Sequence, residues 1–191
     1  MTNHLVLFFL ALLLTSPQEK SRLVPFEDDD GKWGYKNAAG EVVLQPRYAV
    51  AQPFLASGIA AAVDDTGWVY IDARGKAIIR PHVVDNGPDE FSEGLARFVV
   101  KEKFGFFDET GRIVIKPRFD FVLPFHEGLA AVCIGCRPKQ EGEHTAMVGG
   151  KWGFINKKGK LVIEPTFDAA ESFEGDKARV KTKDRWKYIG K

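Results

Sequence analysis

A pattern of hydrophobic and polar positions recurs along most of this chain. Its sharpest copy, residues 150–165, places Trp152 and Phe154 two positions apart, so both rings lie on one face of a predicted strand. A polar turn and a second apolar run follow, which together predict a β-hairpin. The aromatics that correspond to Trp152 are Trp33, Trp68, Phe104 and Trp186.

The turn carries the most specific signal in the sequence. Asn156 opens it and Gly159 closes it. Asn or Asp at the start and Gly at the end are typical of a type I turn with a glycine bulge. The other copies are Asn37 with Gly40, Asp72 with Gly75, and Asp108 with Gly111. A glycine also separates the two aromatics in three copies, as Gly153 does here, and it predicts close approach by another backbone or ring. Val69 and Lys187 depart from this rule.

A second and a third strand complete the unit. The second, residues 161–163 in the sharpest copy, is apolar on both faces, which predicts burial on both sides. We expect each second strand to stop at a proline, because proline cannot donate to a ladder; these are Pro46, Pro81, Pro117 and Pro165. A linker with a Phe (Phe54, Phe91, Phe125, Phe173) then leads to the third strand. Each unit is therefore a three-stranded antiparallel meander of about 35 residues.

These motifs resemble the WG-repeat, or KWG-repeat, family of bacterial proteins. The resemblance covers nearly all of the chain after about residue 22, through segments such as Lys32–Tyr35, Lys103–Phe106 and Lys151–Ile155, and the linkers 91–96 and 125–130. It implies an all-β repeat module without a common activity or catalytic residue. We divide the chain into units 31–63, 64–99, 100–148 and 149–182 and a partial unit 183–191. The tandem meanders curl either into a small β-propeller or into an open β-solenoid.

The N-terminus has a different character. Residues 5–14 are an unbroken apolar run, too short to span a membrane but as long as the core of a secretory signal. We expect residues 1–21 to be a signal peptide, and residues 22–191 to be a secreted or periplasmic domain without a transmembrane span. The net charge of +1 and the lack of nucleic-acid-binding motifs argue against a nucleic-acid partner.

The chain has a single cysteine pair, Cys133 and Cys136. A metal site would have only His144 as a plausible third ligand, and a redox motif of this spacing needs a βαβ setting. In a secreted protein the favoured interpretation is a structural disulfide. We expect no cofactor and no catalytic residue, since no catalytic triad, zinc-protease motif or phosphate loop is present. His82 and His126 lie in linkers, and His82, at a position where other units have Arg47 and Arg118, is interpreted as an exposed variable site rather than a base.

Two further segments are candidates for contacts. Residues 135–149 lengthen one unit and carry Arg137, Lys139, Glu141, Glu143 and His144; this insertion is either a binding loop or a tolerated solvated loop. Near the C-terminus, Lys177, Arg179, Lys181 and Lys183 share one strand face, which meets an anionic partner or simply faces solvent.

We expect an exported, non-enzymatic repeat protein that binds a protein or envelope component. The alternatives are a spacer without a tight partner and a metal-binding protein that uses Cys133, Cys136 and His144.

Overall fold

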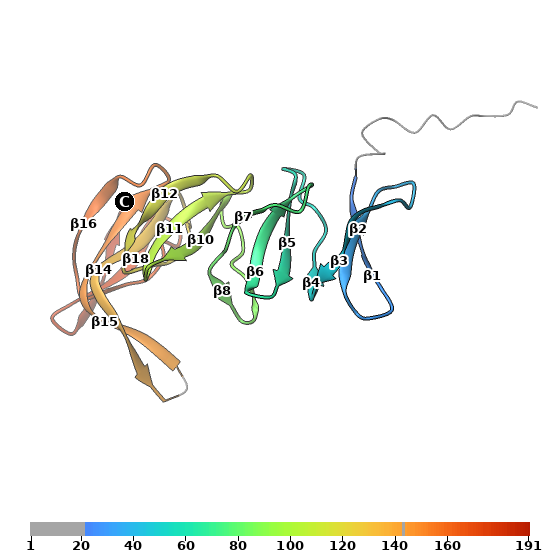
Figure 1. Cartoon of the computed structure of the whole chain (residues 1–191). Coiled ribbons are helices and arrows are strands. Elements are labelled where there is room, and N and C mark those ends of the chain that lie inside the picture. The colour runs from blue at the N-terminus through green and yellow to red at the C-terminus, as the bar shows by residue number, and fades with distance from the viewer. Residues whose placement is uncertain (1–21, 143) are drawn as a thin grey trace, which may run out of the picture.

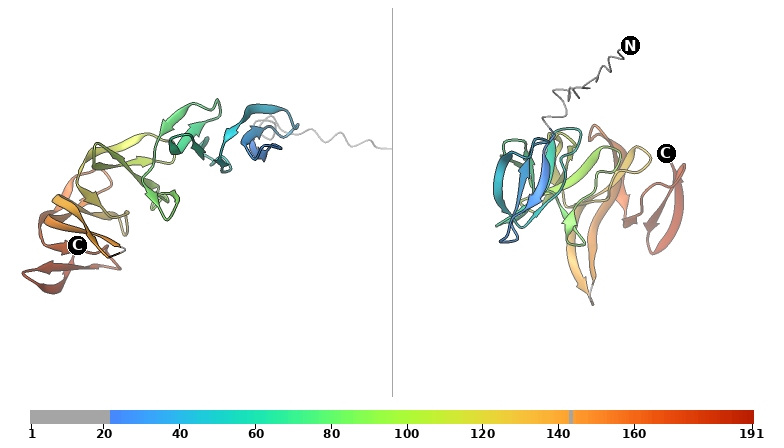
Figure 2. Two further views of the ribbon diagram at one scale, coloured as in Figure 1. Left: turned by 60° about the horizontal axis from the view of Figure 1, so that its bottom comes forward. Right: turned by 90° about the vertical axis from the view of Figure 1, so that its right-hand side faces the viewer.

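The computed structural model describes residues 22–142 and 144–191. The expected signal peptide lies outside these residues. Five small antiparallel sheets follow one another along a curved row, with the first and last sheets at opposite ends (Figures 1 and 2). The array is thus open and solenoid-like, and it does not close into a propeller. In the described part, no helix is long and apolar enough to cross a membrane.

The sheets have three or four strands each. In chain order they are β1 (Val24–Glu27), β2 (Trp33–Lys36) and β3 (Val42–Tyr48); β4 (Val50–Ala51), β5 (Ile59–Asp64), β6 (Gly67–Asp72) and β7 (Ala77–Ile79); β10 (Leu95–Val100), β11 (Lys103–Asp108) and β12 (Ile113–Phe119); β13 (Phe121–Val122), β14 (Leu129–Glu141), β15 (His144–Asn156) and β16 (Leu161–Phe167); and β17 (Ala169–Ala170), β18 (Lys177–Thr182) and β19 (Arg185–Gly190). A separate pair, β8 (Val83–Val84) and β9 (Gly87–Pro88), lies between the second and third sheets along the chain.

Each sheet combines strands from two sequence units. The third strand of one unit pairs with the first strand of the next, as β10 does with β11, and the second strand then pairs with the first. The short strands β4, β13 and β17 begin two residues after a second strand ends and join the following sheet. One continuous segment therefore links each of these sheets to its predecessor.

The core lies between consecutive sheets and is rich in aromatic rings. In four units the second aromatic of the motif meets the linker Phe of its own unit edge to face or tilted. The ring centroids of Tyr35 and Phe54 are 4.9 Å apart, those of Tyr70 and Phe91 5.6 Å, those of Phe106 and Phe125 4.7 Å, and those of Phe154 and Phe173 4.9 Å. Such aromatic pairs stabilise beyond their buried area.

The predicted turns are present. The Gly159 amide donates to the Asn156 carbonyl at 2.8 Å, and the glycine takes a φ of 78°. The Asn156 side-chain oxygen accepts from the Lys158 and Lys160 amides, which closes the turn. The same arrangement recurs at Asn37, Asp72 and Asp108.

Two predictions about the second strands are wrong. Val42, Ile113 and Val162 are 46–50% exposed rather than buried, because each second strand is the outer strand of its sheet and only part of it packs inward. The strands also continue past Pro46, Pro117 and Pro165. A proline is tolerated on an outer strand, where its missing N–H need not break a ladder, and a shift in register accompanies each one.

The close approach predicted at the glycine between the aromatics is made by backbone. A Cβ placed on Gly153 would lie 2.5 Å from the Ile163 carbonyl oxygen and 2.7 Å from the Pro165 nitrogen, and Gly34 and Gly105 have equivalent neighbours. The glycine lets the proline-containing strand cross tightly over the first strand. In the sheet with Val69 the second strand, β7, is only three residues long and does not reach Pro81.

Side chains also tie each sheet to the next. Arg47 donates to the Gly75 carbonyl at 2.8 Å, and Arg118 donates to the Gly159 carbonyl. Glu93 accepts from the Gly128 amide at 3.1 Å and pairs with Lys157 at 2.9 Å. His82 occupies the position that Arg47 and Arg118 hold in other units. It is half-buried, with its ring 5.1 Å from that of Phe104, so the predicted exposure of His82 is wrong.

Candidate functional site: a disulfide-braced hairpin

The insertion at residues 135–149 is part of a long β-hairpin rather than a loop. β14 and β15 pair from Leu129 with Asn156 to Glu141 with His144. The pairing is interrupted once, between Ile134 and Cys136, where Gly135 lies. The half beyond Cys136, which we call the distal hairpin (residues 136–149), extends away from the row of sheets (Figure 1). The hairpin could not be predicted from the sequence, because the strand alternation there is weak and the residues are mostly polar.

A glycine cluster lets the hairpin change direction where it leaves the sheet. Gly135, Gly149 and Gly150 have φ angles of 82°, 73° and 62°, in the region that favours glycine. A Cβ on Gly150 would lie 2.4 Å from the Cys136 nitrogen and 2.5 Å from the Ile134 carbonyl oxygen. The two strands are therefore in closest contact at this point, and only glycine fits there.

The disulfide predicted between Cys133 and Cys136 is present and spans this point. Both cysteines are buried in a cluster with Trp152 and Phe167, and the Cys136 sulfur lies 3.2 Å from the Gly149 carbonyl oxygen. The bond joins Cys133, in the part of β14 that pairs with β13, to Cys136, the first residue of the distal hairpin. The base of the distal hairpin is thereby fixed to the core.

In the disulfide-bonded protein, Cys133 and Cys136 cannot serve as the metal ligands considered above, because a disulfide has no thiolate to bind a metal. The described residues contain no group of three His, Cys, Asp or Glu side chains that could hold a metal ion. The side chain of His144, the third candidate, lies outside what the structure describes, as do those of Glu141 and Glu143.

Asp120 braces the same junction. Its carboxylate accepts from the Gly135 amide at 2.6 Å and forms an ion pair with Lys103. Burial alone would raise the pKa of Asp120, but the hydrogen bonds from Lys103 and Gly135 outweigh it and lower the pKa below its usual value. Asp120 is thus ionised at neutral pH and holds the glycine turn in place.

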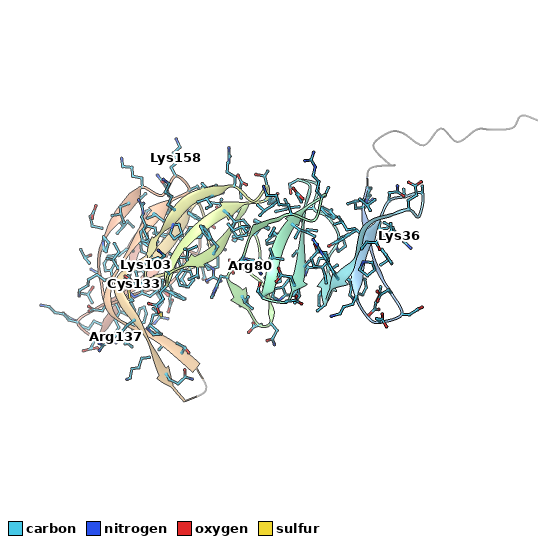
Figure 3. The ribbon with its side chains drawn as sticks, viewed as in Figure 1. Lys36, Arg80, Lys103, Cys133, Arg137 and Lys158 are labelled. Atoms are coloured by element: carbon cyan, nitrogen blue, oxygen red, sulfur yellow. A yellow bond between two sulfur atoms is a disulfide. The ribbon has the colours of Figure 1, made fainter. Side chains whose placement is uncertain are left out.

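The distal hairpin offers both side chains and backbone to a partner. Arg137, Pro138 and Gln140 are exposed, while Met147 is half-buried against the core cluster. Within the described residues, β14 pairs with β13 only up to Cys133, and β15 pairs with β16 only from Trp152 onward. Each distal strand therefore has one unpaired backbone edge. Figure 3 shows Cys133 and Arg137 near the hairpin base and Lys158 on the opposite side of the array.

The basic C-terminal strand has a more ordinary setting. Ala178 and Val180 of β18 are buried and the alternate residues face outward, as predicted. Arg179 pairs with Glu171 at 3.3 Å and lies 4.5 Å from the Trp186 ring, while Lys181 pairs with Asp184 at 3.1 Å. These acidic neighbours offset the positive charge, which favours a solvated outer face. Trp186 is 43% exposed, unlike its core counterpart Trp152, because no second strand covers β19 in the described part.

Comparison with known proteins agrees with this geometry. A family model described as WG containing repeat matches residues 33–68, 104–135 and 152–186, more than half of the chain. The matches begin at Trp33, Phe104 and Trp152, and they leave out residues 69–103, which follow the departure at Val69. No curated protein matches the chain. The recurrent aromatics, turns and sheets and the family match agree: this chain belongs to the WG-repeat family.

Proposed function

We propose that the chain is an exported, non-enzymatic binding module that holds a protein or cell-envelope partner through the distal hairpin. The observation that carries this proposal is the hairpin itself, which leaves the array at a glycine turn and is locked there by the disulfide. Binding elements are typically loops or hairpins positioned by a rigid scaffold.

The base of the distal hairpin is held in place, and its far end has an unpaired backbone edge. The disulfide and the Asp120 contact with Gly135 fix the base, so that little freedom is lost when a partner binds. The unpaired edge of β15 between Thr145 and Val148 contains no proline and can accept an added strand. On the other edge, Pro138 discourages such pairing. One edge is therefore better suited than the other to strand addition.

Single occurrence supports a specific role. The ring pairs, glycine crossings and arginine contacts recur from sheet to sheet, as a scaffold requires, whereas only one unit carries the hairpin extension. Export is supported by the apolar run at residues 5–14 and by the disulfide, since such bonds persist in oxidising compartments. The recurrent residues provide no nucleophile with an adjacent base, which supports a non-enzymatic role.

Affinity capture tests the proposal. Residues 22–191 would be immobilised beside a variant in which Pro138–Met147 is replaced by Asn-Gly, a dipeptide that closes a two-residue hairpin and leaves Cys133 and Cys136 in place. Both would be exposed to envelope extract. We expect the full domain to retain a partner that the shortened variant loses.

A matched control changes an exposed turn on the other side of the array, with Lys158→Ala. Equal capture by the shortened variant would refute the role of the hairpin. No capture by the folded, disulfide-bonded domain would favour the alternative of a structural spacer.

A further inference from the structure

A cavity opens where the repeat pattern is interrupted in the second unit. The linker from Pro81 to Phe91 is two residues longer than the one from Pro117 to Phe125, and the extra length forms the β8–β9 hairpin. Its turn residues Asp85 and Asn86 have φ angles of 48° and 67°, which is typical of a tight type I′ turn. The other units lack this hairpin, and the family match omits this stretch.

The cavity measures about 930 Å³, a size that suits a small organic ligand or a side chain of a bound peptide. Its apolar wall consists of Val84, Pro88, Phe91 and Pro124. These residues come from the β8–β9 hairpin and from the linkers of two consecutive units. The site therefore exists only when the linkers of neighbouring units are stacked.

Asp89, which lines the cavity, belongs to a buried ion pair. Asp89 is 4% and Arg97 is 8% exposed, and the Asp89 carboxylate accepts from the guanidinium and from the Arg97 amide. Arg97 also donates to the Val122 carbonyl at 3.2 Å. Because Arg97 offsets the charge of Asp89 and both are hydrogen-bonded, Asp89 presents a fixed and locally neutralised carboxylate to the cavity. Alanines, Ala61 and Ala131, occupy the position of Arg97 in the neighbouring repeats.

One tyrosine that lines the cavity has a hydroxyl without a hydrogen-bond partner among the described residues. Tyr70 is 5% exposed and lines the cavity, yet its hydroxyl has no hydrogen bond to any described residue. The hydroxyl of its counterpart Tyr35, by contrast, donates to the Gln52 carbonyl at 2.8 Å. Burial, and then the charge of Asp89, raise the pKa of Tyr70 to about 12, so the phenol stays protonated at neutral pH. It is available to a polar atom of a ligand.

The rim of the cavity is acidic. Asp85 and Glu90 are exposed, and within the described part of the chain neither forms an ion pair or a side-chain hydrogen bond. No lysine or arginine lines the cavity. An apolar wall below two carboxylates without partners suits a ligand with an apolar stem and a positive end.

We propose that this cavity binds an ammonium or guanidinium group carried on an apolar stem. The stem lies along Phe91 and Val84, the cation lies between Asp85 and Glu90, and the Tyr70 hydroxyl meets a polar atom of the ligand. The chemistry is shared by the arginine or lysine side chains of a peptide and by free organic amines. This site is separate from the distal hairpin and does not depend on the function proposed for it.

Fluorescence of Trp68 offers a direct readout, because its indole N–H donates to the Asn86 carbonyl in the β8–β9 turn at 2.9 Å. The probes are hexylammonium, N-acetyl-arginine methylamide and a short peptide with one arginine between leucines. Hexanol and hexanoate have a similar stem but lack the positive charge. We expect the three cations to bind with saturation and the two controls to bind at least about tenfold more weakly, a difference of one decade in Kd.

Variants locate the site. Asp85→Asn together with Glu90→Gln should raise the Kd for the cations about tenfold, and asparagine tolerates the positive φ of Asp85. Tyr70→Phe, which removes only the hydroxyl, should weaken the peptide and the arginine amide more than hexylammonium. Glu109→Gln with Glu164→Gln makes the same change in charge at exposed positions elsewhere and should leave the Kd unchanged, as should the shortened hairpin variant.

The possible results of these binding experiments either support or overturn the proposal. Tighter binding of the peptide than of hexylammonium identifies a peptide side chain as the source, and equal binding identifies a free amine; both support the proposal. Failure of all three cations to bind, equal binding of hexanol, or an unchanged Kd in the Asp85 and Glu90 double variant would overturn it.

Discussion

Two sheets of this array differ at the residue between the two aromatics of the motif, and their second strands differ as well. In the sheet β13–β16, Gly153 lets the strand containing Pro165 cross closely, and Trp152 pairs with Phe167 beyond the proline. In the sheet β4–β7 the equivalent residue is Val69, β7 ends at Ile79, and Trp68 has no such pairing. The valine thus coincides with a second strand that ends before the crossing.

The comparison also shows where function can arise in a repeat protein. Sheets that obey the pattern bury equivalent aromatic rings and repeat the same turns. Where the pattern is interrupted, the released linker forms the β8–β9 hairpin and its cavity, and an insertion elsewhere forms the distal hairpin. The two candidate sites therefore lie in the parts that occur once.

The largest expected effect is that of Trp152→Ala, which removes a core ring that is 6% exposed. We expect a loss of about 3–5 kcal/mol in the free energy of unfolding, measured by urea denaturation. The indole N–H of Trp152 is buried without a partner, and Phe104 fills the same position in another sheet. Trp152→Phe should therefore cost less than about 1.5 kcal/mol.

Trp186 is the matched control in the last sheet. Because it is 43% exposed, Trp186→Ala should cost less than about 1 kcal/mol. A similar large loss for both tryptophans would contradict the distinction between covered and uncovered first strands.

Gly153→Val places the valine found at position 69 into a sheet whose second strand crosses closely over the first. The new Cβ would meet backbone atoms at 2.5–2.7 Å, so we expect about 3 kcal/mol of destabilisation in the same assay. Val69→Gly introduces no clash. It removes a buried valine side chain and adds backbone freedom to the unfolded chain, so we expect a loss of about 2 kcal/mol in the free energy of unfolding. A harmless Gly153→Val would show that the close crossing does not require glycine.

Arg118→Ala should have a smaller effect. Arg118 donates to the Gly159 carbonyl and lies 4.9 Å from the Phe119 ring, so its loss should cost about 1–2 kcal/mol. Thr166 holds the same position in the next unit but is exposed and has no such partner within the described residues. Thr166→Ala should change the unfolding free energy by less than about 0.5 kcal/mol. Equal effects would mean that the arginine contact adds nothing to stability.

The smallest predicted effect depends on pH. Burial and the charge of Arg97 lower the pKa of His82 below its usual 6.5. The unfolded chain then binds a proton more readily than the folded one, so the contribution of His82 is fully present above pH 6.5 and is lost as the pH falls toward the folded pKa. Between pH 7 and 5 the wild type should lose more stability than His82→Gln. Parallel curves for the two proteins would contradict this.

The sequence predicts the recurrent part of the fold well, because turn chemistry is local. Asn or Asp followed three residues later by Gly, as in Asn156 and Gly159, indicates the turn in each unit, and Gly153 indicates a close contact. The exposure of Val42 and Val162 could not be foreseen, since an apolar run does not distinguish a central strand from an outer one. The distal hairpin was missed because its strands have no apolar alternation. The cavity was missed because its walls come from linkers that meet only in space.

The most direct test of the hairpin's role is site-specific photocrosslinking in cells. A photoreactive residue would replace Arg137 on the distal hairpin in one variant and Lys158 on the opposite turn in another; both positions are exposed. We expect one discrete crosslinked partner from position 137 and none from position 158. An adduct from position 158 alone, or no adduct from position 137 in a folded and exported protein, would contradict it.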